Sequence, residues 1–198
     1  REEFNSFVNA WGGDVVAKHD MADSGFTANV LSEVEEKGID ALMIAGSPDT
    51  LDEAAEVIIE NRRKLPILAG NELYNRLVLE ETGTESQALT VAVPWHLLSR
   101  DTEEDFVETS RDLWKGDVSW RTATAYDAVI AIAAGLTGDS SRAGLKAALD
   151  DNNFSVDSAT GPINFLPSGD RRQVDRLVQV ERGTRSGTGY DFVPFTLD

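Results

Sequence analysis

The side chains best placed to bind a small molecule follow three predicted strands, each at the point where the strand ends. They are Ser47 and Pro48 after one apolar run, Asn71 and Glu72 after the next, and Trp95 after a third. The carboxyl ends of parallel strands meet at one edge of a sheet, and ligands of open α/β sheets bind outside that edge. We therefore expect these residues to line a solute site that works by recognition, through hydrogen bonds and an aromatic wall.

Glu72 and Trp95 each have a structural interpretation beside the functional one. A carboxylate in a cleft loses part of its hydration, and a cationic group of a ligand would compensate by pairing with it. An acid in the first turn of a helix is also favoured by the helix dipole without any ligand. An aromatic residue at a strand end, such as Trp95, commonly packs in a core or between lobes. Both interpretations stay open at this point.

No pattern in the sequence predicts catalysis or a metal site. The chain contains no cysteine, and its two histidines, His19 and His96, lack the spacing of a metal site. There is no Gly-x-Ser-x-Gly elbow and no dinucleotide fingerprint, and no nucleophile, base and orienting group can be assembled. We expect no enzyme activity, no cofactor and no metal; an enzyme on a flavodoxin-like sheet is the weakest alternative. The polar residues His19, Asp20 and Asp23 favour loop solvation over a role in a cleft.

The charge balance excludes two classes of partner. The 198 residues include 35 acidic and 18 basic side chains, which give a formal net charge of −17. Nucleic acids and anionic membrane surfaces both attract proteins through basic patches, so neither is an expected partner. No run of residues approaches the roughly 18 apolar positions of a membrane span.

Helices and apolar strands alternate through most of the first hundred residues and must position the candidate site. The patterns predict helices over 4–11, 26–37, 50–63, 73–80 and 101–114, and strands over 15–16, 39–45, 65–69 and 88–93. Thr50 and Glu53 form a predicted capping box at the start of one helix. Strands that are apolar throughout and separated by single helices predict an α/β fold, with a doubly wound parallel sheet covered on both faces.

The alternation ends at about Trp120. Two helices follow with no strand between them, over 122–136 and 141–149, and then short strands over 161–166, 174–181 and 190–195. The glycine-rich loop 183–189 lies between two of these strands with no helix after it, which favours a hairpin over a phosphate-binding loop.

Two motifs in this later part are the most specific in the chain. Ala125-Tyr126-Asp127-Ala128-Val129, and Thr160-Gly161-Pro162-Ile163-Asn164-Phe165 with Gly169-Asp170, together with the preceding order of elements, resemble the type I periplasmic binding fold of the branched-chain amino-acid-binding (Leu/Ile/Val-binding) family. The resemblance implies a Rossmann-like second lobe over 1–118, a partial first-lobe return segment over 119–167, and C-terminal strands over 168–198 that return to the second lobe. It also implies that the first lobe and the strand opening the second are absent from this sequence.

The resemblance implies a function and a site. Family members are extracytoplasmic solute-binding components of ABC transporters that close two lobes on an amino acid or a related polar solute. Glu72 lines up with the acid that holds the ligand's α-ammonium, whereas Ser47 or Pro48 stands where members often carry an aromatic contact. The implied location is periplasmic or extracellular, with a lipid anchor as an option for a full-length form, and the implied partners are membrane transporter subunits. A sensory or regulatory module fused to a signalling domain is the alternative.

The helix containing Tyr126 is expected to need a cover. By resemblance, its apolar side packs on the first lobe's sheet, and that side consists of Tyr126, Val129, Ile130, Ala133 and Leu136. Large apolar patches are rarely left bare, so we expect this side to meet the missing lobe or to drive self-association. Tyr126 itself is expected to pack, and Asp127 to orient or solvate the helix.

Overall fold

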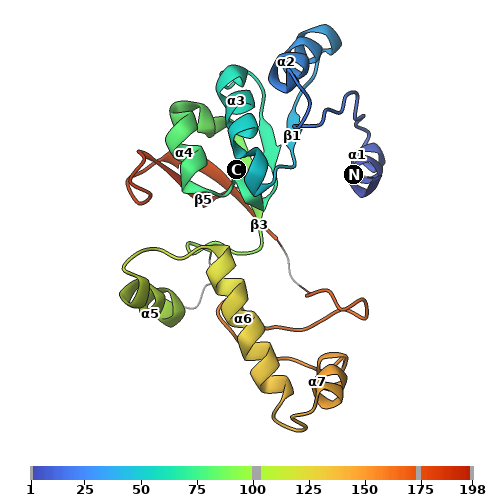
Figure 1. Cartoon of the computed structure of the whole chain (residues 1–198), viewed down its shortest axis with the longest axis vertical. Helices are drawn as coiled ribbons and strands as arrows, with labels where there is room; N and C mark the ends of the chain where they lie inside the picture. Colours follow the sequence, from blue (N-terminus) through green and yellow to red (C-terminus); the bar gives the residue numbers. More distant parts are fainter. Residues whose placement is uncertain (1, 100–103, 173–174, 197–198) are drawn as a thin grey trace. The chain divides into compact units, whose positions relative to one another are not determined.

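The computed structural model describes residues 2–99, 104–172 and 175–196 (Figure 1). It divides into two compact units. The first comprises Arg1–Val91 with Gln179–Phe192, and the second comprises Ala92–Val178 with Val193–Asp198. The predicted helix residues 101–103 and strand residue 174 lie outside the described residues.

A five-stranded sheet organises the described strands in the order β1-β2-β3-β4-β5. Its strands are β1 (Leu42–Ile44), β2 (Ile67–Ala69), β3 (Leu89–Val93), β4 (Arg176–Arg182) and β5 (Tyr190–Pro194). The first three are parallel, with Leu42 opposite Ile67 and Ile67 opposite Leu89. The Gly183 N–H donates to the Gly189 carbonyl at 3.1 Å, so 183–189 closes a hairpin as predicted. The α/β class with a parallel sheet is confirmed.

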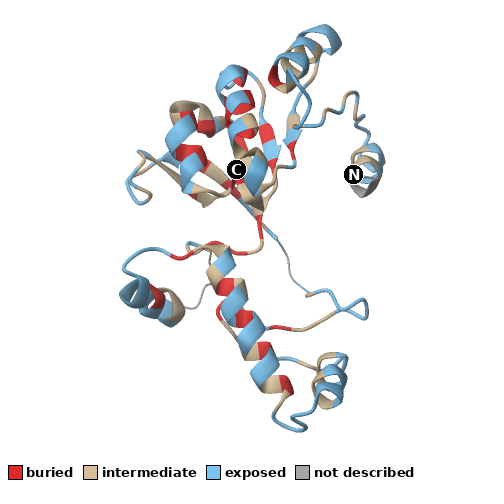
Figure 2. Cartoon of the chain, in the orientation of Figure 1, coloured by how far each residue is buried: buried red, intermediate tan, exposed pale blue. Residues whose placement is uncertain are grey.

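Helices of the first unit follow the predicted alternation. They are α1 (Glu2–Ala10), α2 (Phe26–Lys37), α3 (Leu51–Asn61) and α4 (Arg76–Thr82), with the short 3-10 helices η1 (Pro48–Thr50), η2 (Asn71–Leu73) and η3 (Gly83–Ala88). Helix α3 packs between α2 and α4, and its Ala54, Val57 and Ile58 are fully buried (Figure 2). Helix α2 ends at Gly38, whose left-handed φ of 64° is the conformation that glycine adopts without strain.

Two expectations about the strands of this unit are wrong. Met43 and Leu68 lie opposite each other in register and are 43% and 37% exposed, so one face of β1 and β2 is open rather than covered. The predicted strand at Val15 and Val16 does not form, since residues 13–20 are neither helix nor strand. Two valines supply β propensity, but a strand needs a hydrogen-bonded neighbour, and the sheet ends at β1.

The second unit contains α5 (Glu104–Trp114), α6 (Trp120–Gly135) and α7 (Arg142–Leu149). Its α6 and α7 approach so closely at Gly135 that a Cβ there would lie 2.6 Å from Leu145 Cδ1. The predicted strand over 161–166 is replaced by two isolated antiparallel bridges, Val156 with Ile163 and Phe165 with Arg171. Gly161-Pro162 interrupts the ladder, because proline has no N–H to donate.

Asp127 joins the most specific motifs of the sequence inside the second unit. It is 3% exposed, and its Oδ2 accepts hydrogen bonds from the Thr160 hydroxyl and from Arg171 Nη1, the latter at 2.6 Å. Of the two roles expected for Asp127, the structure therefore supports orientation of the helix and contradicts solvation. Its carboxylate ties α6 to a chain segment more than thirty residues away.

The opposite side of α6 faces solvent (Figure 2). Tyr126, Val129 and Ile132 are 46%, 64% and 46% exposed. Ala133 is exposed as well, while Ile130 and Leu136 are half-buried. The ring of Tyr126 packs at 5.1 Å from that of Phe106 on α5, as expected for a packing tyrosine.

Candidate functional site

The loop after β1 places Ser47 and Pro48 at the carboxyl edge of the sheet. Ser47 caps η1: its N–H donates to Thr50 Oγ1 at 2.9 Å, and the two hydroxyl oxygens lie 3.2 Å apart. The capping box is therefore Ser47 with Thr50, not Thr50 with Glu53 as predicted. The reason is that the chain first makes a 3-10 turn beginning at Pro48, which moves the cap three residues earlier. Ser47 is half-buried and Pro48 is exposed.

The loop after β2 carries Asn71 and Glu72 in η2. The Gly70 N–H donates to the Ile44 carbonyl at 3.2 Å, which joins the ends of β1 and β2. Both Asn71 and Glu72 are half-buried, whereas their neighbour Leu73 is completely buried. Glu72 thus stands in the first turn of a short helix, partly shielded from water.

These two loops touch each other. A Cβ on Gly46 would lie 2.9 Å from Leu73 Cδ1, so the glycine permits the close approach. The structure accordingly brings the loop of Ser47 and Pro48 against the loop of Asn71 and Glu72 within the first unit. A hydroxyl, an amide and a carboxylate at one sheet edge can orient a small polar solute by hydrogen bonds and charge.

Trp95 belongs to the second unit and lies in an apolar cluster. It is 4% exposed and packs with Val118 and Ala123, and its ring meets Phe106 edge-on at 6.1 Å. The indole Nε1 is buried without an acceptor among the described residues. These contacts support the interpretation of Trp95 as a core residue, and its role as a ligand contact stays a prediction.

The polar residues near position 20 serve local structure. His19 Nε2 lies 3.2 Å from Glu33 Oε2, and Lys37 Nζ lies 3.1 Å from the same oxygen. The ion pair with Lys37, aided by the contact with His19, holds the pKa of Glu33 below its usual value. The Ala22 N–H donates to Asp20 Oδ1 at 3.1 Å. His19 thereby attaches its segment to α2.

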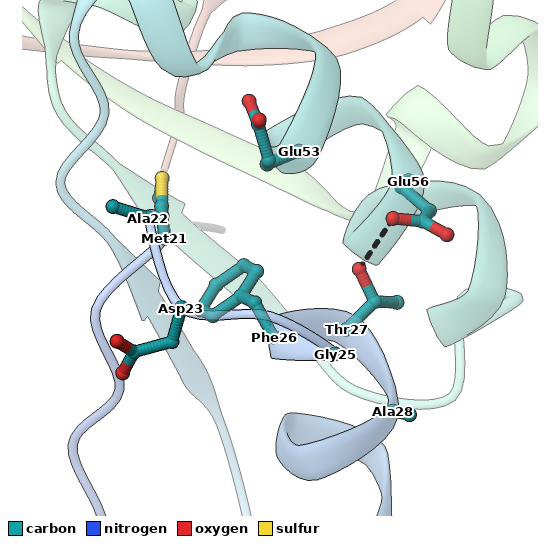
Figure 3. Close-up of a pocket in the computed structure, with 9 residues that line it drawn as sticks. All are labelled: Met21, Ala22, Asp23, Gly25, Phe26, Thr27, Ala28, Glu53 and Glu56. Carbon is teal, nitrogen blue, oxygen red and sulfur yellow. Dashed lines mark hydrogen bonds between the residues drawn. The ribbon is translucent and has the colours of Figure 1, made fainter.

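A cavity of about 390 Å³ lies between the start of α2 and α3 (Figure 3). Its wall contains the apolar Met21 and Phe26 and the acidic Asp23, Glu53 and Glu56. Thr27 Oγ1 donates to Glu56 Oε2 at 2.7 Å. No pattern along the chain predicted this cavity, because its residues come from two separate segments, 21–28 and 53–56, that share no motif. In the described part of the chain, no three acidic or histidine side chains could hold a metal ion.

The described residues also contain no helix that is both long and apolar enough to cross a bilayer.

Comparisons with known proteins identify the fold. No protein-family model and no curated protein matches the sequence. Among solved structures, the leucine binding protein LivK of Thermotoga maritima matches with a TM-score of 0.75 and 21% identity, over 93% of this chain and 52% of that one. LivJ of Streptococcus pneumoniae, a branched-chain amino acid transporter substrate binding protein in complex with isoleucine, matches with a TM-score of 0.73 and 18% identity, over 96% and 55%.

A third similar structure contains a different ligand. It is a solute binding protein of an ABC transporter from Rhodopseudomonas palustris in complex with p-hydroxybenzoic acid, with a TM-score of 0.77 and 15% identity, over 98% of this chain and 55% of that one. This chain spans about half the length of each of these proteins. It has the type I periplasmic binding fold over that half.

Proposed function

We propose that this chain is part of an extracytoplasmic solute-binding protein that delivers an amino acid or a related polar solute to an ABC transporter. The observation that carries the proposal is the match of nearly the whole chain to solute-binding proteins of such transporters, with TM-scores from 0.64 to 0.77. The predicted division into a second lobe, a return segment and C-terminal strands belongs to the same proposal.

The loops at the carboxyl edge of the sheet would supply the contacts. Glu72 would pair with the solute's ammonium group, while Ser47, Pro48 and Asn71 would contact the rest of it. A carboxylate favours a cation and repels an anion. Amino acids carry an ammonium group and aromatic acids such as p-hydroxybenzoic acid do not, so Glu72 supports an amino acid as the solute.

Binding would work by lobe closure without chemical conversion. A solute that touches two lobes stabilises the closed arrangement through contacts that the open one cannot make. This chain spans about half of the similar structures, so it would supply only part of those contacts. We expect weak amino-acid binding by the chain alone. The membrane subunits of the transporter would be partners of the whole protein outside the cytoplasm.

The test is titration of the ¹⁵N-labelled chain with leucine, isoleucine and p-hydroxybenzoate, followed by the amide shifts in NMR spectra. We expect millimolar leucine to shift the amides around Ser47 and Glu72, and p-hydroxybenzoate to shift them less. Glu72→Gln should abolish the leucine response, whereas Glu81→Gln, an exposed acid on α4, should preserve it.

Four results would contradict the proposal: submicromolar affinity in calorimetry, equal responses to the two solute classes, an unaffected Glu72→Gln variant, or turnover in a hydrolase screen. The first would show that this half of the fold forms a complete site. The next two would remove Glu72 from the site, and the last would make the protein an enzyme.

A further inference from the structure

The segment that follows α7 contains an asparagine, an aromatic residue and a serine in succession. Asn153, Phe154 and Ser155 form the tripeptide Asn-x-Ser, whose middle residue is not proline. Asn153 is also the only asparagine in the sequence with a serine or threonine two positions later. This spacing is the acceptor pattern for N-linked glycans, which are attached to surface loops of exported proteins. The pattern acts only where the amide and the hydroxyl can both be reached.

The backbone presents the tripeptide at a β-turn of the second unit. The Phe154 N–H donates to the Asp151 carbonyl at 2.9 Å, which closes a turn with Asn153 at one of its two central positions. Just beyond the tripeptide, Val156 pairs with a neighbouring segment in an antiparallel bridge. The acceptor pattern is therefore held between a turn and a bridge, outside any helix or strand.

The middle residue anchors the tripeptide while the residues on either side of it face solvent. The ring of Phe154 is half-buried and stacks on the ring of Phe165, with centroids 5.9 Å apart. Asn153 and Ser155 are both exposed. Phe165 belongs to the same unit, so this unit by itself fixes the segment and leaves the amide and the hydroxyl accessible together.

The side-chain amide of Asn153 is oriented but not fully used. Its Nδ2 donates to Asp151 Oδ1 at 3.1 Å, and the same oxygen accepts the backbone N–H of Asn153 at 2.8 Å. An amide nitrogen carries two hydrogens, so one of them remains for contact with an enzyme. The contact with Asp151 holds the amide in place on the exposed side of the turn.

We propose that Asn153 is the acceptor of an N-linked glycan. Asn153 Nδ2 attacks the anomeric carbon of an oligosaccharide carried on a polyprenyl diphosphate. The bond between that carbon and the diphosphate oxygen breaks, the lipid diphosphate leaves, and one proton passes from Nδ2 to a base of the transferring enzyme. This role rests on the proposed function, because such glycans are added to proteins exported from the cytoplasm.

The first test is transfer to the purified whole chain by a purified oligosaccharyltransferase, with a polyprenyl-diphosphate oligosaccharide as donor, followed by mass spectrometry of the intact protein. The mass should rise by that of one glycan. Asn153→Gln and Ser155→Ala should each abolish the increase, whereas Ser155→Thr, which keeps the hydroxyl, should preserve it.

Asn152→Gln is the matched control, because Asn152 is exposed on the same turn but has Phe154 two positions later. This variant should accept the glycan as the unmodified chain does. No transfer to the unmodified chain, or transfer that persists in Asn153→Gln, would overturn the proposal.

The second test distinguishes failure of this role from failure of the proposed function. In full-length protein isolated from outside the cytoplasm of its own cells, the peptide that contains Asn153 should carry the glycan. An unmodified Asn153 there would overturn the proposal and leave the solute-binding function standing, whereas protein confined to the cytoplasm would overturn both. Asn153→Gln should leave the response to leucine unchanged, since Ser47 and Glu72 belong to the first unit.

Discussion

Removal of the Asp127 carboxylate is expected to destabilise the second unit strongly. The side chains of Asp127 and Arg171 are 4% and 18% exposed, and their charged atoms lie 2.6 Å apart. Asp127→Ala leaves the guanidinium largely buried without its counter-charge and deprives the Thr160 hydroxyl of its acceptor. Breaking a buried pair by removing one partner costs about 3–5 kcal/mol. Because water reaches part of Arg171, we expect about 3 kcal/mol, which is roughly a hundredfold change in the folding equilibrium.

The assay is urea unfolding followed by tryptophan fluorescence, since Trp95, Trp114 and Trp120 all lie in the second unit. The matched control is Asp117→Ala. Asp117 Oδ1 lies 2.7 Å from Arg111 Nη2, but the side chains of Asp117 and Arg111 are 26% and 47% exposed. Such surface ion pairs contribute about 0–1 kcal/mol to stability.

A double variant distinguishes the stabilisation by the ion pair from the cost of leaving one buried charge without its partner. Asp127→Leu with Arg171→Leu removes both charges and should recover most of the lost stability, because apolar replacement of a whole buried pair is often near neutral. A loss below about 1 kcal/mol for Asp127→Ala would refute the reasoning. So would a double variant as unstable as the single one.

Three further changes test local features of the first unit. Gly183→Ala should lower the free energy of unfolding in urea by about 1–3 kcal/mol. The new Cβ would displace the Asp191 carboxylate, which accepts hydrogen bonds from two loop N–H groups. The control Gly116→Ala, with open space around the glycine, should cost less. Burial acts to raise the pKa of Asp191, but these backbone N–H groups outweigh it and hold the pKa below the usual value. The stabilisation of the hairpin by this carboxylate should be present above about pH 4 and be lost as pH falls through the lowered pKa. Asp191→Asn should flatten this dependence in acid titrations, and an unchanged profile would contradict the prediction. Asn61→Ala should cost about 2 kcal/mol of unfolding free energy, since the buried amide bonds both the carbonyl and the N–H of Leu65 at 2.9 and 3.2 Å; a midpoint equal to that of the unmodified chain would contradict it.

Periodicity along the chain predicted the elements that depend on near neighbours. The helical spacing over 26–37 with Gly38 behind it became α2, and three apolar runs became the parallel strands β1 to β3. The positions of Ser47 and Glu72 at the ends of those strands followed from the same pattern. Such features are decided by backbone conformation and by which side of an element is apolar, and both are local.

Local pattern failed where the outcome depended on a distant neighbour. Val15 and Val16 have strand propensity but no adjacent strand, and Met43 has an apolar side chain but no cover. The capping box moved from Thr50 to Ser47 because the chain turned earlier than the helical periodicity implied. In each case the residues had the local preference for the predicted structure, but contacts with other parts of the chain decided whether it formed.

The sequence by itself determined the α/β class, the order of helices and strands, and the apolar character of α6. Only the tertiary structure decided that Asp127 faces inward to Arg171, 44 positions away, and that Val129 faces solvent. Both residues lie on one helix of suitable composition, so the pattern along the chain could not assign their environments. A buried charge needs a counter-charge, and an apolar side chain is covered only where another element reaches it; both depend on contacts between segments far apart in the chain.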